Sequence, residues 1–200
     1  MSEKTQSVKD LAAQILKSKD LIEEIVAALA GPMRRNRQNA ASVLAQVAKI
    51  EPEALVPYID EFIDALNRPE AQTRWESLDV LTELVAFESR SCDKAISGAE
   101  IALFDEDNGL VRLAALRFLC TLGATTENRS QKVWLLLDEA IQCYHGDYEY
   151  QDMLHALIGF SSGKLAPEVK QGLSERVAFD AEHGKGALQR RSQQIIDNLS

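Results

Sequence analysis

Apolar residues recur along most of the chain at the three- and four-residue spacing of one helix face. The pattern is clearest from Ala40 to Val47, and it returns from Ser77 to Leu84 and from Ala115 to Leu122, after shifts of 37 and then 38 residues. A fourth copy opens at Met153, and a looser fifth copy opens at Ser192. A fixed period of this length predicts stacked helix pairs, because each pair buries its apolar face against its neighbours.

Each of these helices is preceded by another amphipathic segment, and turn-forming residues such as Gly31-Pro32 and Asn67 to Pro69 separate the two. No long linker interrupts the series. The sequence therefore predicts an all-α fold, a right-handed α-α superhelix of about five antiparallel helix pairs in a single domain over residues 1–200. The approximate repeats are 19–50, 53–87, 92–122, 131–161 and 166–199.

The two ends of the array differ from its middle. Ser7 with Asp10 resembles a capping box, so a short helix is expected at residues 7–17, where its apolar face would cover the first repeat. The last helix, around Gln189 to Gln194, is much more polar than its counterparts. A polar terminal helix suits the end of a solenoid, because no further repeat buries its outer face.

One polar position recurs with the apolar ones. Arg37, Arg74 and Arg112 each stand three residues before the small residue that opens the core set. A planar guanidinium can bridge a carboxylate in its own turn or in the adjacent one. Since recurrence at a fixed register is what stacking requires, the sequence predicts a structural, inter-repeat role for these three arginines.

The same arginines carry a family resemblance. Val111-Arg112, following Leu103-Phe104-Asp105, resembles the HEAT-repeat motif, which has an acidic residue in the intra-repeat turn and then a Val-Arg pair opening the second helix. Thr73-Arg74 after Asn67 is a partial copy, and Tyr150 stands where a fourth arginine would be. The resemblance to HEAT-repeat and armadillo-like proteins covers about residues 19–160. It implies a non-enzymatic scaffold or adaptor.

Composition and charge narrow the classes of partner. The chain carries a formal net charge of −9, which repels phosphate backbones and anionic lipids. We therefore expect no nucleic-acid partner and no membrane association, and no stretch approaches the ~20 apolar residues of a spanning helix. The three cysteines are scattered, without a CxxC pair, and Met1 to Asp20 lacks an apolar run of signal-peptide length. These features favour a cytoplasmic protein with reduced thiols.

A candidate partner groove follows from helix geometry. On each second helix, the stripe opposite the core lines the concave surface of a HEAT array, to which the resemblance assigns partner binding. An exposed Trp is the kind of anchor that dominates interface energies, although the alternative is that neighbouring repeats bury it. The candidate groove residues are Trp75, Asp79, Leu113, Arg117, Gln151 and His155.

A second candidate surface is the turn from Tyr144 to Tyr150, which holds Tyr144, Tyr148 and Tyr150. Tyrosine joins a rigid apolar body to a polar tip and suits peptide contacts, but these rings can equally pack the turn.

No catalytic constellation, phosphate-binding loop or zinc-site spacing is present, so no catalytic residue, metal or cofactor is expected. The favoured function is protein or peptide binding. A nucleic-acid-binding protein or DNA-repair enzyme of HEAT-like fold is the alternative, which the net charge of −9 disfavours. An array that dimerises through its ends is a third hypothesis.

Overall fold

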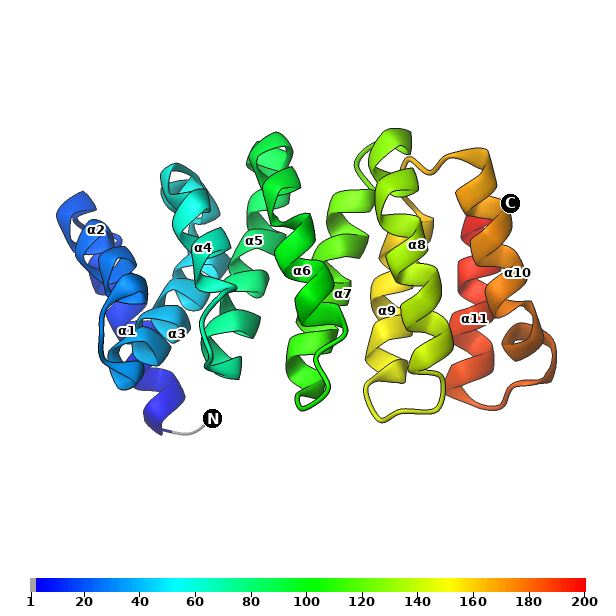
Figure 1. The fold of residues 1–200 in the computed structure, drawn as a ribbon, viewed down its shortest axis with the longest axis horizontal. Coiled ribbons are helices and arrows are strands. Elements are labelled where there is room, and N and C mark those ends of the chain that lie inside the picture. The colour runs from blue at the N-terminus through cyan, green and yellow to red at the C-terminus, as the bar shows by residue number, and fades with distance from the viewer. Residues whose placement is uncertain (1–2) are drawn as a thin grey trace. The chain divides into compact units, whose positions relative to one another are not determined.

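The chain folds into successive pairs of helices, and no strand occurs among residues 3–200. The computed structural model describes residues 3–200, with the side chains of residues 8–200. Two compact units result, residues 1–102 and residues 103–200 (Figure 1). Their boundary falls at the end of a helix inside the third expected repeat. The class of fold predicted from the sequence, helix pairs preceded by an N-terminal helix, is confirmed.

The first unit contains the N-terminal helix and the first two complete pairs. Short 3-10 segments adjoin the first helix of each pair. Its elements are α1 (Glu3–Ile15), α2 (Lys19–Ala27), η1 (Ala28–Ala30), α3 (Arg34–Ile50), η2 (Pro52–Tyr58), α4 (Ile59–Ala65), α5 (Ala71–Cys92), η3 (Asp93–Ala95) and α6 (Ile96–Leu103).

The N-terminal helix and the two second helices pack in order, with α1 against α3 and α3 against α5. The helix α5 is broken at Glu88, whose φ of −144° and ψ of 59° are not helical. The break coincides with the end of the second apolar set.

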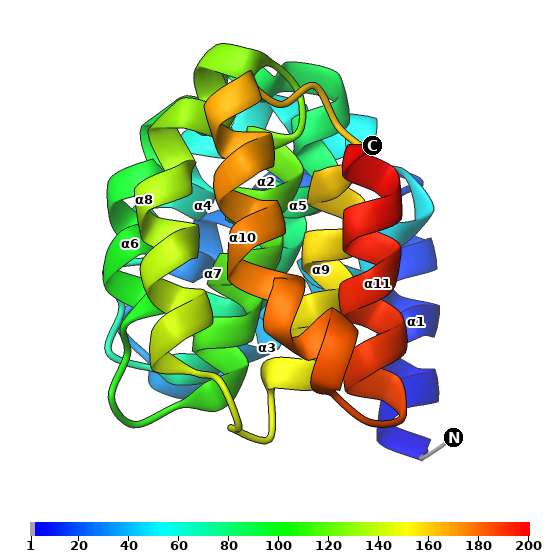
Figure 2. The same ribbon diagram turned by 90° about the vertical axis from the view of Figure 1, so that its right-hand side faces the viewer.

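The second unit contains α7 (Gly109–Gly123), α8 (Glu127–Cys143), α9 (Tyr150–Ser161), α10 (Pro167–His183) and α11 (Ala187–Leu199). The helices α7, α9 and α11 pack in order, while α8 packs against α10 (Figure 2). Local signals set the helix starts. The side chains of Asn108 and Thr126 each accept a bond from a first-turn backbone N–H at 3.2 Å, and Pro167 occupies the first turn of α10.

The repeating apolar positions form the core. Each of the first three sets has five members, and all of them are buried. They are Ala40, Ala41, Val43, Leu44 and Val47, then Ser77, Leu78, Val80, Leu81 and Leu84, and then Ala115, Leu116, Phe118, Leu119 and Leu122. In the fourth copy Met153 and Phe160 are buried, and in the fifth Ser192 and Ile195 are. The prediction of the core from helical spacing is therefore confirmed, because stacking leaves that one face of each second helix without access to water.

The prediction for the N-terminal helix was wrong at its start. The helix α1 begins at Glu3, so the backbone of Ser7 lies inside the helix and not at its N-cap. The Ser-x-x-Asp spacing that resembled a capping box falls within the first turns. Farther along, Ala12 and Ile15 are buried, as the predicted packing of this helix on the first repeat requires.

Candidate functional site

The second-helix face of the first unit carries a connected polar network between α3 and α5. The hydroxyl of Ser42 on α3 lies 2.8 Å and 2.9 Å from the two carboxylate oxygens of Glu76 on α5. The amide of Gln72 donates to the Ser42 hydroxyl at 2.8 Å and to Glu76 at 3.3 Å. These three side chains fix one another across the two helices, and they leave a carboxylate on a partly solvated surface.

Trp75 and Asp79 extend this network along α5. Both side chains are half-buried, and with Gln72 and Glu76 they occupy positions spaced three and four apart on one helix face. The four residues lie away from Ser77, Leu78 and Leu81, which form the core side of the same helix. We refer to Ser42, Gln72, Trp75, Glu76 and Asp79 as the α3–α5 surface. Sequence reasoning selected Trp75 and Asp79, and it missed Glu76 because its partner, Ser42, lies 34 residues away.

The electrostatics of this surface are unusual for a solvated helix. Burial raises the pKa of Glu76 above its ordinary value, and the negative charge of Asp79 adds to the rise. The hydrogen bonds from Ser42 and Gln72 and the charge of Lys49 act in the opposite direction. The hydrogen bonds and the charge of Lys49 therefore offset only part of the effect of burial on the Glu76 carboxylate.

The second-helix face of the second unit is different. Arg117 on α7 and His155 on α9 are exposed, as expected, whereas Gln151 is half-buried. The side-chain oxygen and the backbone carbonyl of Gln151 both accept bonds from Arg191 of α11, at 2.9 Å and 2.7 Å. Gln151 therefore links two repeats within this unit.

The expectation that Leu113 lines an open groove was wrong. The side chain of Leu113 is 5% exposed, and Cys120, farther along the same stripe, is 2% exposed. The helix α7 packs against both α8 and α9, so positions opposite the main core of this helix are also covered. Burial raises the pKa of the Cys120 thiol, as expected for a thiol removed from water.

The tyrosine turn divides into packed and exposed residues. Tyr150 is 3% exposed, which corrects the expectation that it faces a partner. The Tyr144 ring lies 5.1 Å from the guanidinium carbon of Arg112, and its hydroxyl donates to the Leu103 carbonyl at 2.8 Å. Only Tyr148, whose side chain is fully exposed, is available among the three. Two of these rings therefore pack the turn.

Arg37 and Arg112, two of the recurring arginines, each reach a carboxylate of the following repeat. Arg37 donates to both carboxylate oxygens of Glu70, which immediately precedes α5, and to the carbonyls of Gly31 and Pro32 at 2.8 Å and 3.0 Å. Arg112 donates to Glu149, which immediately precedes α9, at 2.9 Å, and to the Asp105 carbonyl at 3.0 Å. The carboxylate therefore comes from the N-cap of the next second helix. In the repeat that follows Arg74, the N-cap of the second helix, α7, is Asn108.

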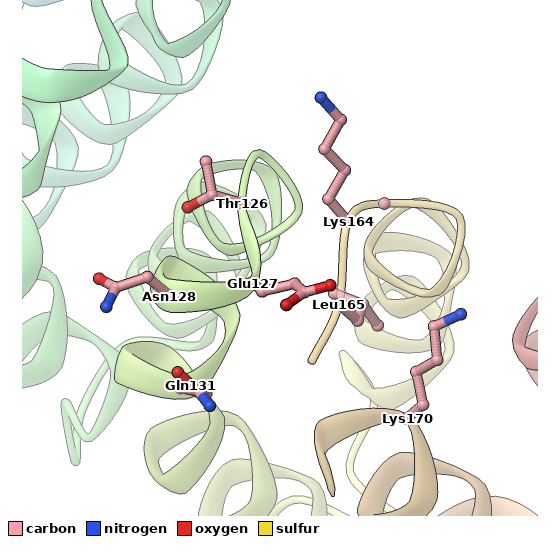
Figure 3. A pocket seen from close by; sticks show the side chains of 8 residues that line it. Thr126, Glu127, Asn128, Gln131, Lys164, Leu165 and Lys170 are labelled. Atoms are coloured by element: carbon pink, nitrogen blue, oxygen red, sulfur yellow. The ribbon is translucent and has the colours of Figure 1, made fainter. Parts of the chain in front are cut away.

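One hollow in the second unit does not form a site. It has a volume of about 690 Å³ and lies between the start of α8, the loop after α9 and the start of α10 (Figure 3). Its two cationic side chains, Lys164 and Lys170, point in different directions, and the carboxylate of Glu127 also lines the hollow. Within the described residues, no group of three or more His, Cys, Asp or Glu side chains is placed to hold a metal ion. No helix in this part of the chain combines the length and apolar character needed to cross a membrane.

Comparison with known proteins identifies the fold. No protein-family model and no curated protein matches the chain. Among solved structures, a designed armadillo repeat protein in complex with the peptide (KR)4 matches with a TM-score of 0.79 at 15% identity, over 98% of this chain and 91% of that one. Designed armadillo repeat proteins for modular peptide recognition match with a TM-score of 0.75 at 16% identity, over 97% and 91%. An archaeal HEAT-like repeats protein from Thermococcus onnurineus NA1 matches with a TM-score of 0.55 at 18% identity, over 99% and 93%. The chain thus has the armadillo/HEAT-like repeat fold.

Proposed function

We propose that this armadillo/HEAT-like repeat protein is a non-enzymatic scaffold that binds a protein or peptide segment on its second helices, and that the α3–α5 surface is where binding is anchored. The observation that carries the proposal is the network of Ser42, Gln72 and Glu76 beside the half-buried Trp75. A surface whose side chains are already fixed loses little conformational entropy when a partner is bound. A Trp at the centre of such a surface is the residue type that contributes most to interface energies.

The charges of the surface favour a partner that carries Lys or Arg. Glu76 and Asp79 place two carboxylates on neighbouring turns of α5, and the whole chain has a formal net charge of −9. A cation bound between them would relieve the unfavourable environment of the Glu76 carboxylate. The designed armadillo protein that shares this fold is in complex with the basic peptide (KR)4. That peptide is therefore a suitable probe for this chain.

The test is the affinity of the full chain for fluorescently labelled (KR)4, measured by anisotropy at two salt concentrations. We expect Trp75→Ala and Glu76→Gln each to weaken binding by about fivefold or more, since both remove a group at the centre of the surface. The matched control is Glu61→Gln, which removes the same charge from an exposed position on α4 of the same unit. Because the control carries the same net charge, it separates a specific surface from general attraction between opposite charges.

The pH dependence of binding follows from the raised pKa of Glu76. A cationic ligand favours the charged carboxylate, so binding should release a proton and affinity should rise with pH through the range in which Glu76 ionises. In Glu76→Gln this dependence should be lost. The melting temperature of this variant should not fall, because an acid with a raised pKa in the folded state contributes no stability when it is charged.

Two results would contradict the proposal. One is that both variants bind (KR)4 as tightly as Glu61→Gln does. The other is a collapse of the melting temperature in Trp75→Ala, which would place Trp75 in the core. The control for loss of an indole ring is the second tryptophan, Trp134, on α8, the first helix of the fourth pair. Its ring packs against Gly172 of α10 and lies outside the α3–α5 surface. Trp134→Ala should reduce stability and leave the affinity of the folded protein unchanged.

A further inference from the structure

The last two repeats lack the pair between an arginine and the next N-cap carboxylate that is formed by Arg37 and by Arg112. Arg37 and Arg112 each pair with a carboxylate at the N-cap of the next second helix. In the fourth repeat Tyr150 stands at the position of the arginine. In the fifth repeat Gly186 stands at the N-cap of the second helix, α11, in place of the carboxylate. The turn after α8 is held to the last turn of α10 by His145 and Asp180. The contact that involves a histidine joins the same two helices as the Arg176–Asp138 ion pair, but it holds a different carboxylate.

The geometry of this joint places a carboxylate in the interior. The Asp180 side chain is 7% exposed, and an oxygen of its carboxylate lies 2.9 Å from Nε2 of His145. The His145 ring in turn lies 4.9 Å from the ring of the buried Tyr150. Burial raises the pKa of Tyr150, and the negative charge of Asp180 contributes to that rise. A buried carboxylate requires a charged or hydrogen-bonding partner, and the joint supplies a single imidazole.

The two arginines near the joint have partners of their own. On α10, Arg176 is bound to Asp138 of α8 at 2.7 Å and 3.0 Å. On α11, Arg191 is bound to Gln151 of α9. Asp147 lies in the same turn as His145, and the exposed residues that follow Asp180 are Glu182, His183 and Lys185. Among the residues that the structure describes, no other cation makes a hydrogen bond to the Asp180 carboxylate.

Protons can reach the joint from solvent. About half of the His145 side chain is exposed. It lines a hollow of about 330 Å³ together with Gly146, Tyr148 and Leu188. A histidine in contact with water changes charge between about pH 5 and pH 8, a range in which arginine keeps its charge. The two contacts therefore differ in kind, because the Arg112–Glu149 joint contains an arginine and the His145–Asp180 contact contains a histidine.

We propose that the joint between the fourth and fifth repeats is a pH-responsive contact, in which protonated His145 holds the buried Asp180 carboxylate and releases it as the pH rises. Below the titration range of the imidazole, the two side chains form an ion pair. Above that range the pair loses its attraction, and the carboxylate stays buried with a neutral partner. Local opening of α10 and α11 away from α8 and α9 is then easier, while the joint formed by Arg112 and Glu149 is unaffected.

The test is hydrogen exchange of the full chain at pH 6 and pH 8, with amide protection in α10 and α11 corrected for the intrinsic exchange rate. We expect protection in these two helices to be about threefold lower at pH 8, the size of effect typical of one partly exposed ion pair. Protection in α7 should be the same at both values. An NMR titration of the histidine rings should give a midpoint for His145 that coincides with the change in protection.

The deciding variant is His145→Gln, which retains a donor but cannot gain a charge. Its protection in α10 and α11 should be the same at pH 6 and pH 8, near the wild-type value at pH 8. The other two histidines of the chain provide matched controls, and both His155→Gln and His183→Gln should keep the threefold difference. Equal wild-type protection at the two pH values would overturn the proposal. So would a threefold difference that persists in His145→Gln.

Discussion

The Arg37–Glu70 joint of the first unit and the His145–Asp180 joint of the second unit each give a buried carboxylate a partner, but the partner side chains differ. In the first, the planar guanidinium of Arg37 reaches both oxygens of Glu70, and the residue Glu70 is 5% exposed. In the second, an imidazole reaches one oxygen of an equally buried Asp180. Both join consecutive repeats through a buried carboxylate. In each case the buried carboxylate has a hydrogen-bonding partner, which is an arginine in the first unit and a histidine in the second.

The two joints should respond to pH in opposite directions. The hydrogen bond from Arg37 holds the pKa of Glu70 below its ordinary value. Its contribution to stability is therefore complete above the ordinary range of a glutamate, about pH 4.5, and is lost as the pH falls through the lowered pKa. The His145–Asp180 contact is proposed to weaken as the pH rises. The repeat array would then have one joint sensitive to acid and another sensitive to base.

The largest expected effect comes from breaking the first joint. Arg37→Ala leaves Glu70 buried without its cation, which is the situation in which removing one member of an ion pair is most destabilising. We expect the melting temperature to fall by about 6 °C or more. Circular dichroism at 222 nm measures the transition, and Arg35→Ala, an exposed neighbour on the same helix, is the control. An unchanged melting temperature would show that Glu70 finds another partner or becomes solvated.

A smaller effect is expected from crowding the Arg112 joint. The Glu149 carboxylate lies directly against Gly109 at the start of α7, where an added Cβ would collide with it. Gly109→Ala should displace Glu149 from Arg112 and lower the free energy of unfolding by about 2 kcal/mol. Gly159→Ala is the matched control, because that glycine lies within α9 with open space around it. The control should raise stability by about 0.5 kcal/mol, as alanine does in a helix interior, and urea unfolding measures both.

The smallest effects distinguish the tyrosines of the turn. Tyr144→Phe removes the hydrogen bond to the Leu103 carbonyl but keeps the ring against Arg112, so a loss of about 1 kcal/mol is expected. Tyr148→Phe changes a fully exposed side chain and should alter stability by less than about 0.5 kcal/mol. Equal losses in the two variants would mean that Tyr148 packs in solution. The same urea unfolding experiment makes the comparison.

The burial of a residue could be predicted from the sequence wherever the spacing of apolar residues along one helix was enough to decide it. Core positions such as Leu44, Leu81 and Leu119 follow from the spacing of apolar residues on a single helix, and all are buried. Prediction was less accurate where a neighbouring helix decides exposure. Leu113 lies opposite the main core of α7, yet a second packing partner covers that side. Tyr150 stands where the fourth arginine was expected, and it is buried beside the histidine joint.

The candidate site shows the same division. Trp75 and Asp79 could be selected because a Trp on the face opposite the core is unusual in a sequence. Glu76 could not, because its importance depends on Ser42, one repeat earlier, and on the burial that raises its pKa. Likewise, no short spacing relates His145 to Asp180, which are 35 residues apart.

The sequence by itself determined the helix pairs, their period and their apolar faces, because these depend on interactions between residues three or four apart. The tertiary structure decided which polar groups meet across repeats. Glu70 and Glu149 became partners of Arg37 and Arg112, and Ser42 became the partner of Glu76, because stacking brings together residues 33 to 37 positions apart. A repeat period predicts that such neighbours exist. Their identity depends on the registration of one helix against the next, which is fixed by packing in three dimensions.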